Sequence, residues 1–314
     1  MSLETLTLVD SRSGARARIV PGIGFNCYSF EVPTSASPVE TLWTAADFLG
    51  GKGRPSGSGI PLLFPFAGRI RGTSFRYDGK QYNLTAGDGQ GNAIHGFVID
   101  RPWRVTRHEA DRVRGEFQAS LDDAALLDHW PSDFRITAEY QVAGNSLVAD
   151  YTVDNPGTSR LPFGFGTHPY FRIPLGSTSG ATCRVTVGVE HDWQLEGLLP
   201  TGRKGPSATA AELARGAAVG GLKLDHVFSG LKFENHRLTT TVADPTSKRT
   251  LAMTFDDRFT ACVVYTPLHR EAVCIEPYTT IPDPFTLAEK GIDPYLQTLD
   301  PGQTFQARIE IRLD

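Results

Sequence analysis

Alternation between apolar and polar residues constrains the fold of this chain more than any other feature. Every second residue of the segment 134–142 is apolar, and residues 147–153 follow the same pattern after a turn at Ala143-Gly144-Asn145. A period of two places the apolar side chains on one face of a β-strand. The two segments therefore predict a hairpin with one face in a core and the other in water.

Other segments extend this β pattern. Residues 305–313 alternate in the same way, which predicts that the chain ends in a strand belonging to a sheet. Asp78-Gly79 separates residues 75–77 from residues 80–82, and this dipeptide favours the type I′ turn of a second hairpin. Helical signals are few, at residues 122–129 and at residues 209–218, where a Gly-Pro-Ser segment can cap the second helix.

Composition fits one large β-rich unit. The 314 residues include 32 glycines and 21 prolines, which indicates many turns, and 40% are hydrophobic, which is enough for a sizeable core. No low-complexity linker or fixed-period repeat divides the chain. We predict an all-β fold, a large antiparallel β-sandwich with few short helices, as a single domain over residues 1–314.

Charge and cysteine spacing indicate the class of partner and the compartment. The net charge is −4 without a basic cluster, so we expect a small neutral or mildly polar substrate rather than nucleic acid or an anionic membrane. The N-terminus lacks a signal-peptide pattern and no apolar run is long enough to span a membrane, so we expect a cytoplasmic protein. The widely separated cysteines predict reduced, mostly buried thiols: Cys27, Cys183, Cys262 and Cys274.

Two residues are candidates for acid/base chemistry. His168 lies in a glycine-rich aromatic stretch, where Gly164 and Gly166 allow a ligand to approach the backbone and aromatic walls can tune the imidazole pKa. Glu276 follows the strand-like residues 272–275, so we expect it to emerge at a sheet edge or cleft mouth. A histidine with a pKa near 6 to 7 and an ionised glutamate can serve as acid and base at neutral pH. A core histidine and a salt-bridged glutamate are the plainer alternatives.

Three further residues are candidates for substrate contact. Arg69 follows an apolar, proline-braced stretch that could hold its guanidinium in a pocket, and His95 lies at the junction of a flexible segment with a strand. Alternation places Asp225 and Val227 on one face and His226 on the other. A surface arginine, a structural histidine and a turn-capping aspartate are the plainer alternatives for these positions.

Motifs of several enzyme classes are missing. The sequence has no Gly-x-Ser-x-Gly elbow, no Gly-x-Gly-x-x-Gly, no P-loop and no His-Glu-x-x-His. The eight histidines show no metal-ligand spacing, although a metal site assembled from distant residues stays open. Serine hydrolase, dinucleotide-binding, P-loop and zincin functions therefore have no support.

Taken together and in this order, five segments resemble the aldose 1-epimerase (galactose mutarotase) family. They are Phe64-Pro65-Phe66-Ala67-Gly68-Arg69-Ile70, His95-Gly96, Thr167-His168-Pro169-Tyr170-Phe171, Leu224-Asp225-His226-Val227-Phe228 and Glu276-Pro277-Tyr278-Thr279. The resemblance spans most of the chain. It implies a galactose mutarotase-like β-supersandwich with an open sugar cleft and neither a metal nor an organic cofactor. The expected partner is a small-molecule sugar, with the protein a monomer or homodimer.

The resemblance also implies roles for these residues. His168 would donate a proton to the pyranose ring oxygen while Glu276 takes the proton of the anomeric hydroxyl, and the ring would open, rotate about C1–C2 and reclose. His95 would steady the charge near the ring oxygen. Arg69 and Asp225 would hold sugar hydroxyls. The expected apolar platform for the sugar is drawn from Phe97, Tyr170, Phe171 and Trp193.

Substrate and activity have alternatives at this point. Pro277-Tyr278-Thr279 follows Glu276, where galactose-acting members commonly carry Pro-Gln, so the identity of the sugar is open. Lysine and arginine are not enriched around the five segments, which favours a free neutral aldose over a phosphorylated or otherwise substituted hexose. A non-catalytic carbohydrate-binding protein on the same fold is a second possibility. A glycoside hydrolase that uses Asp225 and Glu276 is a third.

Overall fold

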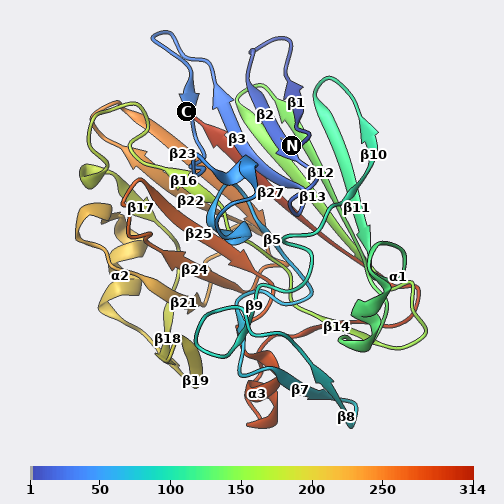
Figure 1. Ribbon diagram of the computed structural model, residues 1–314. Coiled ribbons are helices and arrows are strands. Elements are labelled where there is room, and N and C mark those ends of the chain that lie inside the picture. The colour runs from blue at the N-terminus through green and yellow to red at the C-terminus, as the bar shows by residue number, and fades with distance from the viewer. Residues whose placement is uncertain (1–2) are drawn as a thin grey trace.

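Two large antiparallel sheets dominate the fold, described here for residues 3–314 from a computed structural model (Figure 1). The nine-stranded sheet has the order β10-β11-β12-β13-β27-β23-β22-β17-β20. Its strands are β10 (Arg104–His108), β11 (Arg112–Gln118), β12 (Arg135–Ala143), β13 (Ser146–Asp154), β27 (Thr304–Leu313), β23 (Arg249–Asp256), β22 (Arg237–Asp244), β17 (Arg184–Thr186) and β20 (Ala217–Ala218). The all-β prediction is confirmed.

The eight-stranded sheet carries most of the candidate site. Its order is β19-β18-β21-β24-β25-β15-β5, and β16 also pairs with β25. The strands are β19 (Leu199–Gly205), β18 (His191–Glu196), β21 (Asp225–Ser229), β24 (Ala261–Tyr265), β25 (Ala272–Tyr278), β15 (Gly166–Thr167), β5 (Leu62–Leu63) and β16 (Tyr170–Arg172). Strand β25 is thus in the interior of the sheet.

Smaller elements surround these sheets. A four-stranded sheet contains β1 (Leu6–Val9), β2 (Arg16–Val20), β3 (Asn26–Val32) and β4 (Val39–Glu40). Two-stranded pairs join β6 (Arg69–Ile70) to β9 (Ala93–Ile94), β7 (Ser74–Tyr77) to β8 (Lys80–Asn83), and β14 (Leu161–Phe163) to β26 (Gln297–Leu299). The α-helices of the described chain are α1 (Ala119–Asp122), α2 (Ala208–Arg215) and α3 (Pro284–Glu289). None of the helices within residues 3–314 has the length and apolar character needed to cross a membrane.

One large apolar core lies between the two main sheets. Tyr140 and Tyr151 enter it from the nine-stranded sheet, whereas Val273 and Ile275 of β25 enter it from the eight-stranded sheet. Because side chains alternate along a strand, the even-numbered residues of β25 face away from this core. The four cysteines are free and buried, as expected.

The predicted hairpins and the C-terminal strand are confirmed. Strands β12 and β13 pair up to Ala143 and Ser146. Strands β7 and β8 are joined through Asp78 and Gly79, whose φ angles of 47° and 76° suit a type I′ turn. Strand β27 pairs with β13 on one side and β23 on the other, so the end of the chain is a central strand.

The helix predictions need adjustment. Helix α2 ends at Arg215 rather than residue 218, because Gly216 has a φ of 92° and Ala217 begins β20. Its expected cap is present, since the Ser207 hydroxyl accepts a hydrogen bond from the Ala210 amide at 3.0 Å. The segment predicted at 122–129 contains only a 3₁₀ turn at 124–128, after α1 has ended. Helix α3 was not predicted, since six residues are too few to show a helical period.

A core position of β27 tests the structural role of this strand. Ile309 is 2% exposed and pairs with Ala149 and Phe255. We expect Ile309→Ala to lower the free energy of unfolding by about 2–5 kcal/mol, because it leaves a cavity between two strands. Urea unfolding followed by near-UV circular dichroism measures this change. Arg312→Ala, in the same strand with a side chain 55% exposed, is the control, and equal midpoints for both variants would contradict a central β27.

Candidate active site

Strand β25 positions Glu276 at the centre of the site. The strand runs through Tyr278, so Glu276 is neither beyond the strand nor at a sheet edge, and of the expected positions only the one in a cleft agrees with the structure. Glu276 pairs with Val263 of β24 and is only 2% exposed. Pro277 does not end the strand, because the register with β24 continues through Cys262 opposite the proline. Glu276 therefore lies within the sheet, on the face away from the core.

His168 lies opposite Glu276 because its segment pairs with β25 on both sides. Gly166 in β15 pairs with Tyr278, and Tyr170 in β16 pairs with Cys274, so the residues between them cross the strand at the level of Glu276. A Cβ atom added to Gly166 would lie 2.5 Å from the Tyr278 ring. The predicted close approach at this glycine is thus to the neighbouring strand rather than to a ligand, and at Gly164 it is to Thr280, two residues beyond the end of β25.

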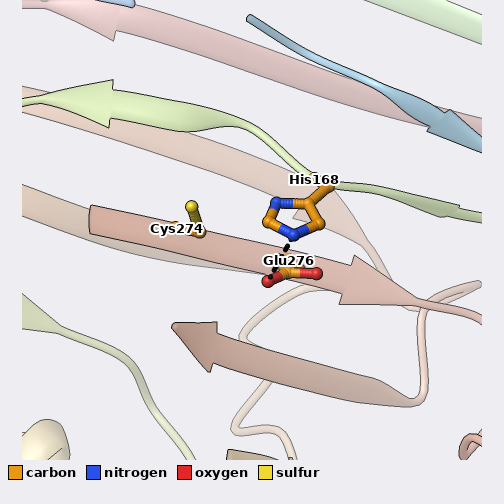
Figure 2. Close-up of side chains that lie close together, drawn as sticks. All are labelled: His168, Cys274 and Glu276. Atoms are coloured by element: carbon orange, nitrogen blue, oxygen red, sulfur yellow. Dashed lines mark ion pairs between the residues drawn. The ribbon is translucent and has the colours of Figure 1, made fainter. Parts of the chain in front are cut away.

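The two side chains are in direct contact (Figure 2). His168 Nε2 lies 3.3 Å from Glu276 Oε1, and the Tyr278 hydroxyl donates a hydrogen bond of 2.6 Å to Glu276 Oε2. The Tyr170 ring stacks on the imidazole at 4.8 Å with an interplanar angle of 3°. The His95 ring meets it edge-on at 5.6 Å. These contacts hold the imidazole and the carboxyl group in fixed orientations.

Burial shifts both pKa values towards the neutral forms. It lowers the pKa of His168 to about 3, so the expected value near 6 to 7 was wrong. Burial also raises the pKa of Glu276 well above its usual range, although the Tyr278 hydrogen bond opposes this shift, so burial favours the protonated form over the expected carboxylate. Burial, with His168 and Arg69 nearby, holds the pKa of His95 well below its usual value. Both shifts favour neutral His168 beside protonated Glu276, an arrangement without net charge.

One cavity of about 640 Å³, which we call the central cleft, brings all the predicted site residues together. It is lined by Arg69, His95, His168, Tyr170, Asp225 and Glu276. Arg69 Nε lies 3.2 Å from Asp88 Oδ2, which fixes the guanidinium. Burial raises the pKa of Asp225. The predicted alternation in β21 is confirmed, because Asp225 and Val227 line this cleft whereas His226 contacts Asp192.

Two of the four aromatic residues expected to form a sugar platform lie in the central cleft. Phe97 and Tyr170 line the central cleft. Phe171 does not, because it is 1% exposed in the main core, and the buried Trp193 lines a neighbouring cleft, with its indole N–H donating to the Ser229 hydroxyl. Sequence reasoning missed Tyr278, which alternation from Glu276 could have placed on the same face.

Further residues of the central cleft were not predicted. Phe66 and Tyr265 add aromatic surface, and Arg54 and Arg101 add cations from segments outside the five motifs. Arg101 is paired with Asp123 at 2.9 Å. Phe66 belongs to the first of the five segments and could have been found there, whereas no sequence signal linked Arg54, Arg101 or Tyr265 to the site.

A third side chain lies beside the pair and offers a metal-binding arrangement. Donor atoms of His168, Cys274 and Glu276 all lie within 4.8 Å of one another (Figure 2). Imidazole, thiolate and carboxylate are ligands typical of zinc. Burial raises the pKa values of Cys274 and Glu276, so a cation would have to displace their protons, and its affinity would rise with pH.

Sequence comparison identifies a family. A model of the family described as Aldose 1-epimerase matches residues 8–312. The uncharacterized protein YihR of Escherichia coli K12 is 24% identical over 245 residues, which cover 74% of this chain and 72% of YihR. The galactose mutarotase of Sus scrofa is 29% identical over 160 residues, 49% of this chain and 44% of that protein.

Solved structures show the same fold. A galactose mutarotase-like protein from Clostridium acetobutylicum superposes with a TM-score of 0.86 at 22% identity, over 100% of this chain and 99% of that one. A putative aldose 1-epimerase from Escherichia coli K12 gives a TM-score of 0.78 at 18% identity, with 99% of each chain covered. The predicted galactose mutarotase-like supersandwich is confirmed.

The low pKa of His168 predicts a pH dependence of stability. Below its ordinary pKa of 6.5 the unfolded chain binds a proton that the folded imidazole takes up only near pH 3, so this residue makes stability fall as pH falls through that window. We expect the wild-type urea midpoint to drop more between pH 7 and about pH 4.5 than that of His168→Gln. Equal drops would mean that the buried imidazole is not held neutral.

Proposed function

The chain belongs to the aldose 1-epimerase family, and from this premise we propose that it interconverts the α and β anomers of a free aldose. The observation that carries the proposal is the buried contact of 3.3 Å between His168 and Glu276 in a cleft that also presents Arg69, His95 and Asp225. An acid and a base that meet in one cleft can act on two oxygens attached to the same carbon. The ring oxygen and the anomeric hydroxyl of an aldose are such a pair.

In the proposed reaction one proton enters and one leaves the sugar at each step. His168 in its protonated form donates to the ring oxygen, Glu276 takes the proton of the anomeric hydroxyl, and the C1–O5 bond breaks to give the aldehyde. Rotation about C1–C2 turns the carbonyl to its other face. The C5 hydroxyl then attacks C1. Its proton passes to His168 while Glu276 gives a proton to the carbonyl oxygen, and the opposite anomer leaves.

The direct contact within the pair matters for this cycle. Burial favours neutral His168 with protonated Glu276, which is the proton arrangement that ring opening produces. To open the ring, the pair must instead have its proton on His168 and an ionised Glu276. Because Nε2 and Oε1 lie 3.3 Å apart, a small closing motion lets the proton move within the pair, without solvent and without a change in net charge.

The surrounding residues can orient the sugar in the cleft. Neutral His95 can share a hydrogen bond with the ring oxygen, the Arg69 guanidinium is a forked donor for hydroxyls, and the Asp225 carboxyl group is an acceptor. Tyr170 stacks on His168 and keeps its ring in one plane.

A neutral sugar fits the charges of the cleft better than a phosphorylated one. Of the arginines lining the central cleft, Arg69 and Arg101 are each paired with a carboxylate, Asp88 and Asp123 respectively. Arg54, at the exposed rim, is the remaining one and has no carboxylate partner in the part of the chain that the structure describes. A buried acid/base pair has no use in a protein that only binds sugars, so we favour catalysis over binding alone.

Removing either proton-transfer group tests the proposal. We expect Glu276→Gln and His168→Asn each to lower kcat by about 10²-fold or more for anomerisation of freshly dissolved α-glucose or α-galactose, because each variant lacks one proton-transfer partner. Polarimetry or NMR of the anomeric protons measures the rate above the spontaneous background. His108→Asn and Glu190→Gln, at exposed positions, are the matched controls. Near-wild-type rates in either site variant would place the chemistry elsewhere, and release of phenol from an aryl glycoside would point to hydrolysis.

Tyr278 offers a second test, through the pH profile. The pair keeps one proton between the low pKa of His168 and the raised pKa of Glu276, so kcat/KM should be level across this range and fall on the alkaline side. The Tyr278 hydrogen bond lowers the pKa of Glu276, so Tyr278→Phe should move the alkaline fall to higher pH and reduce kcat by about tenfold. Tyr265→Phe, which removes a hydroxyl of the same cleft, should leave the fall in place. A fall that stays or moves to lower pH in Tyr278→Phe would refute the role of this hydrogen bond.

A further inference from the structure

A second cleft, which we call the side cleft, adjoins the central cleft. Its volume is about 750 Å³, and its walls come from the β18–β19 hairpin, the segment that leads into α2, and β21. Leu195, Leu198 and Asp225 line both clefts. The two clefts therefore meet at these residues, and Asp225 can contact a ligand in either of them.

The groups that line the side cleft suit a neutral, polyhydroxylated ligand. Asp192 and Asp225 are its carboxyl groups, and Arg203, Lys204 and His226 are its basic groups, so charges of both signs are present. Gln194 is an amide that can both donate and accept hydrogen bonds. With Leu195 and Leu198 as an apolar surface, the cleft offers what a sugar ring needs: mixed donors and acceptors at its edge and carbon on its face.

The hydrogen bonds on this wall are partly preorganised. His226 Nδ1 lies 3.3 Å from Asp192 Oδ2, which also accepts from the Ser207 hydroxyl at 3.1 Å. The Asp192 hydrogen bond raises the pKa of His226. Lys204 Nζ lies 4.9 Å from the centre of the Trp193 ring and 3.4 Å from the Tyr295 hydroxyl. These contacts hold polar groups in place before any ligand binds.

The register of the sheet decides which end of a sugar reaches the side cleft. Val227 pairs with Val263, which pairs with Glu276, so Asp225 is two strands and two residues away from the proposed base. At about 4.8 Å per strand and 3.3 Å per residue, the two backbone positions are roughly 12 Å apart. One sugar ring fits between the two side chains. With the anomeric carbon at Glu276, the opposite ring atom, C4, points towards Asp225 and the side cleft.

We propose that the side cleft is a subsite for the second sugar unit of a 1,4-linked reducing disaccharide, whose reducing end occupies the central cleft. This inference rests on the proposed function for the orientation of the sugar. Contacts made by the second unit are remote from the reacting bonds and add binding energy to both the ground state and the transition state. The subsite should therefore raise kcat/KM for the longer substrate.

Comparing substrates of different length and linkage tests the subsite. We expect at least one of maltose, cellobiose and lactose to be anomerised with a kcat/KM about tenfold above that of glucose or galactose, the gain of roughly one net hydrogen bond. Isomaltose, whose second unit is attached at C6 rather than C4, should show no such gain. Equal kcat/KM for all mono- and disaccharides would overturn the proposal.

Two variants separate the subsite from the chemistry. A Cβ atom added to Gly205 meets no atom within 4 Å, so Gly205→Phe places a ring at the wall of the side cleft without a clash. Gly205→Phe should remove the disaccharide advantage, which is the higher kcat/KM for the disaccharide, and leave kcat/KM for glucose unchanged. Gln194→Ala should remove part of this advantage. Gly221→Phe is the matched control, because its added Cβ is equally free and Gly221 lines neither cleft. A disaccharide advantage that survives Gly205→Phe would overturn the proposal.

Failure of the proposed function gives a different result from failure of the subsite. If the protein accelerates anomerisation of no sugar, the proposed function fails, and calorimetric binding decides the subsite. Tighter binding of a 1,4-linked disaccharide than of its monosaccharide, lost in Gly205→Phe and kept in Gly221→Phe, would support the subsite. Equal binding of both would overturn it.

Discussion

The alternation of side chains along β25 is the constraint on which the rest of the structure depends. Val273 and Ile275 enter the core between the main sheets, and this burial fixes the strand in the interior of its sheet. The same period places Cys274, Glu276 and Tyr278 on the opposite face. A carboxyl group is thus buried by backbone geometry, and its neighbours must satisfy it because an unpartnered buried polar group is costly. The Tyr278 hydroxyl donates a hydrogen bond to one oxygen, and His168 Nε2 lies 3.3 Å from the other.

The electrostatics of the site follow from this placement. A buried carboxyl group and a buried imidazole both lose the solvation of their charged forms, so their pKa values move in opposite directions and towards neutrality. One shared proton satisfies both groups, and its transfer within the pair changes no net charge. The site can therefore supply an acid and a base in turn without exchanging protons with water, which suits a reaction that releases no net proton.

Local sequence patterns predicted the local parts of this structure, and non-local contacts account for the errors. The hairpin at residues 134–153 and strand β27 were predicted because period-two alternation depends only on the segment itself. The ordered motifs indicated which residues would meet. The position of Glu276 within its strand was mispredicted because the strand-like apolar run stops at residue 275, whereas the pairing of β25 with β24 continues through Tyr278. The pKa of His168 was mispredicted because β16 and β25 bury its side chain, and this burial cannot be inferred from the residues next to His168 in the sequence.

The proposed acid/base pair and the proposed subsite depend on different strands of one sheet, so substrate preference can change without loss of chemistry. The proposed acid/base pair depends on β25, which has partners on both sides in the interior of the sheet. The side cleft depends on β18 and β19 at the edge of the same sheet, where substitutions disturb fewer contacts. Strand β21 joins the two regions, because Asp225 lines both clefts and His226 lines the side cleft. Changes in the β18–β19 hairpin would therefore alter which sugars the proposed subsite accepts while the geometry at Glu276 stays fixed.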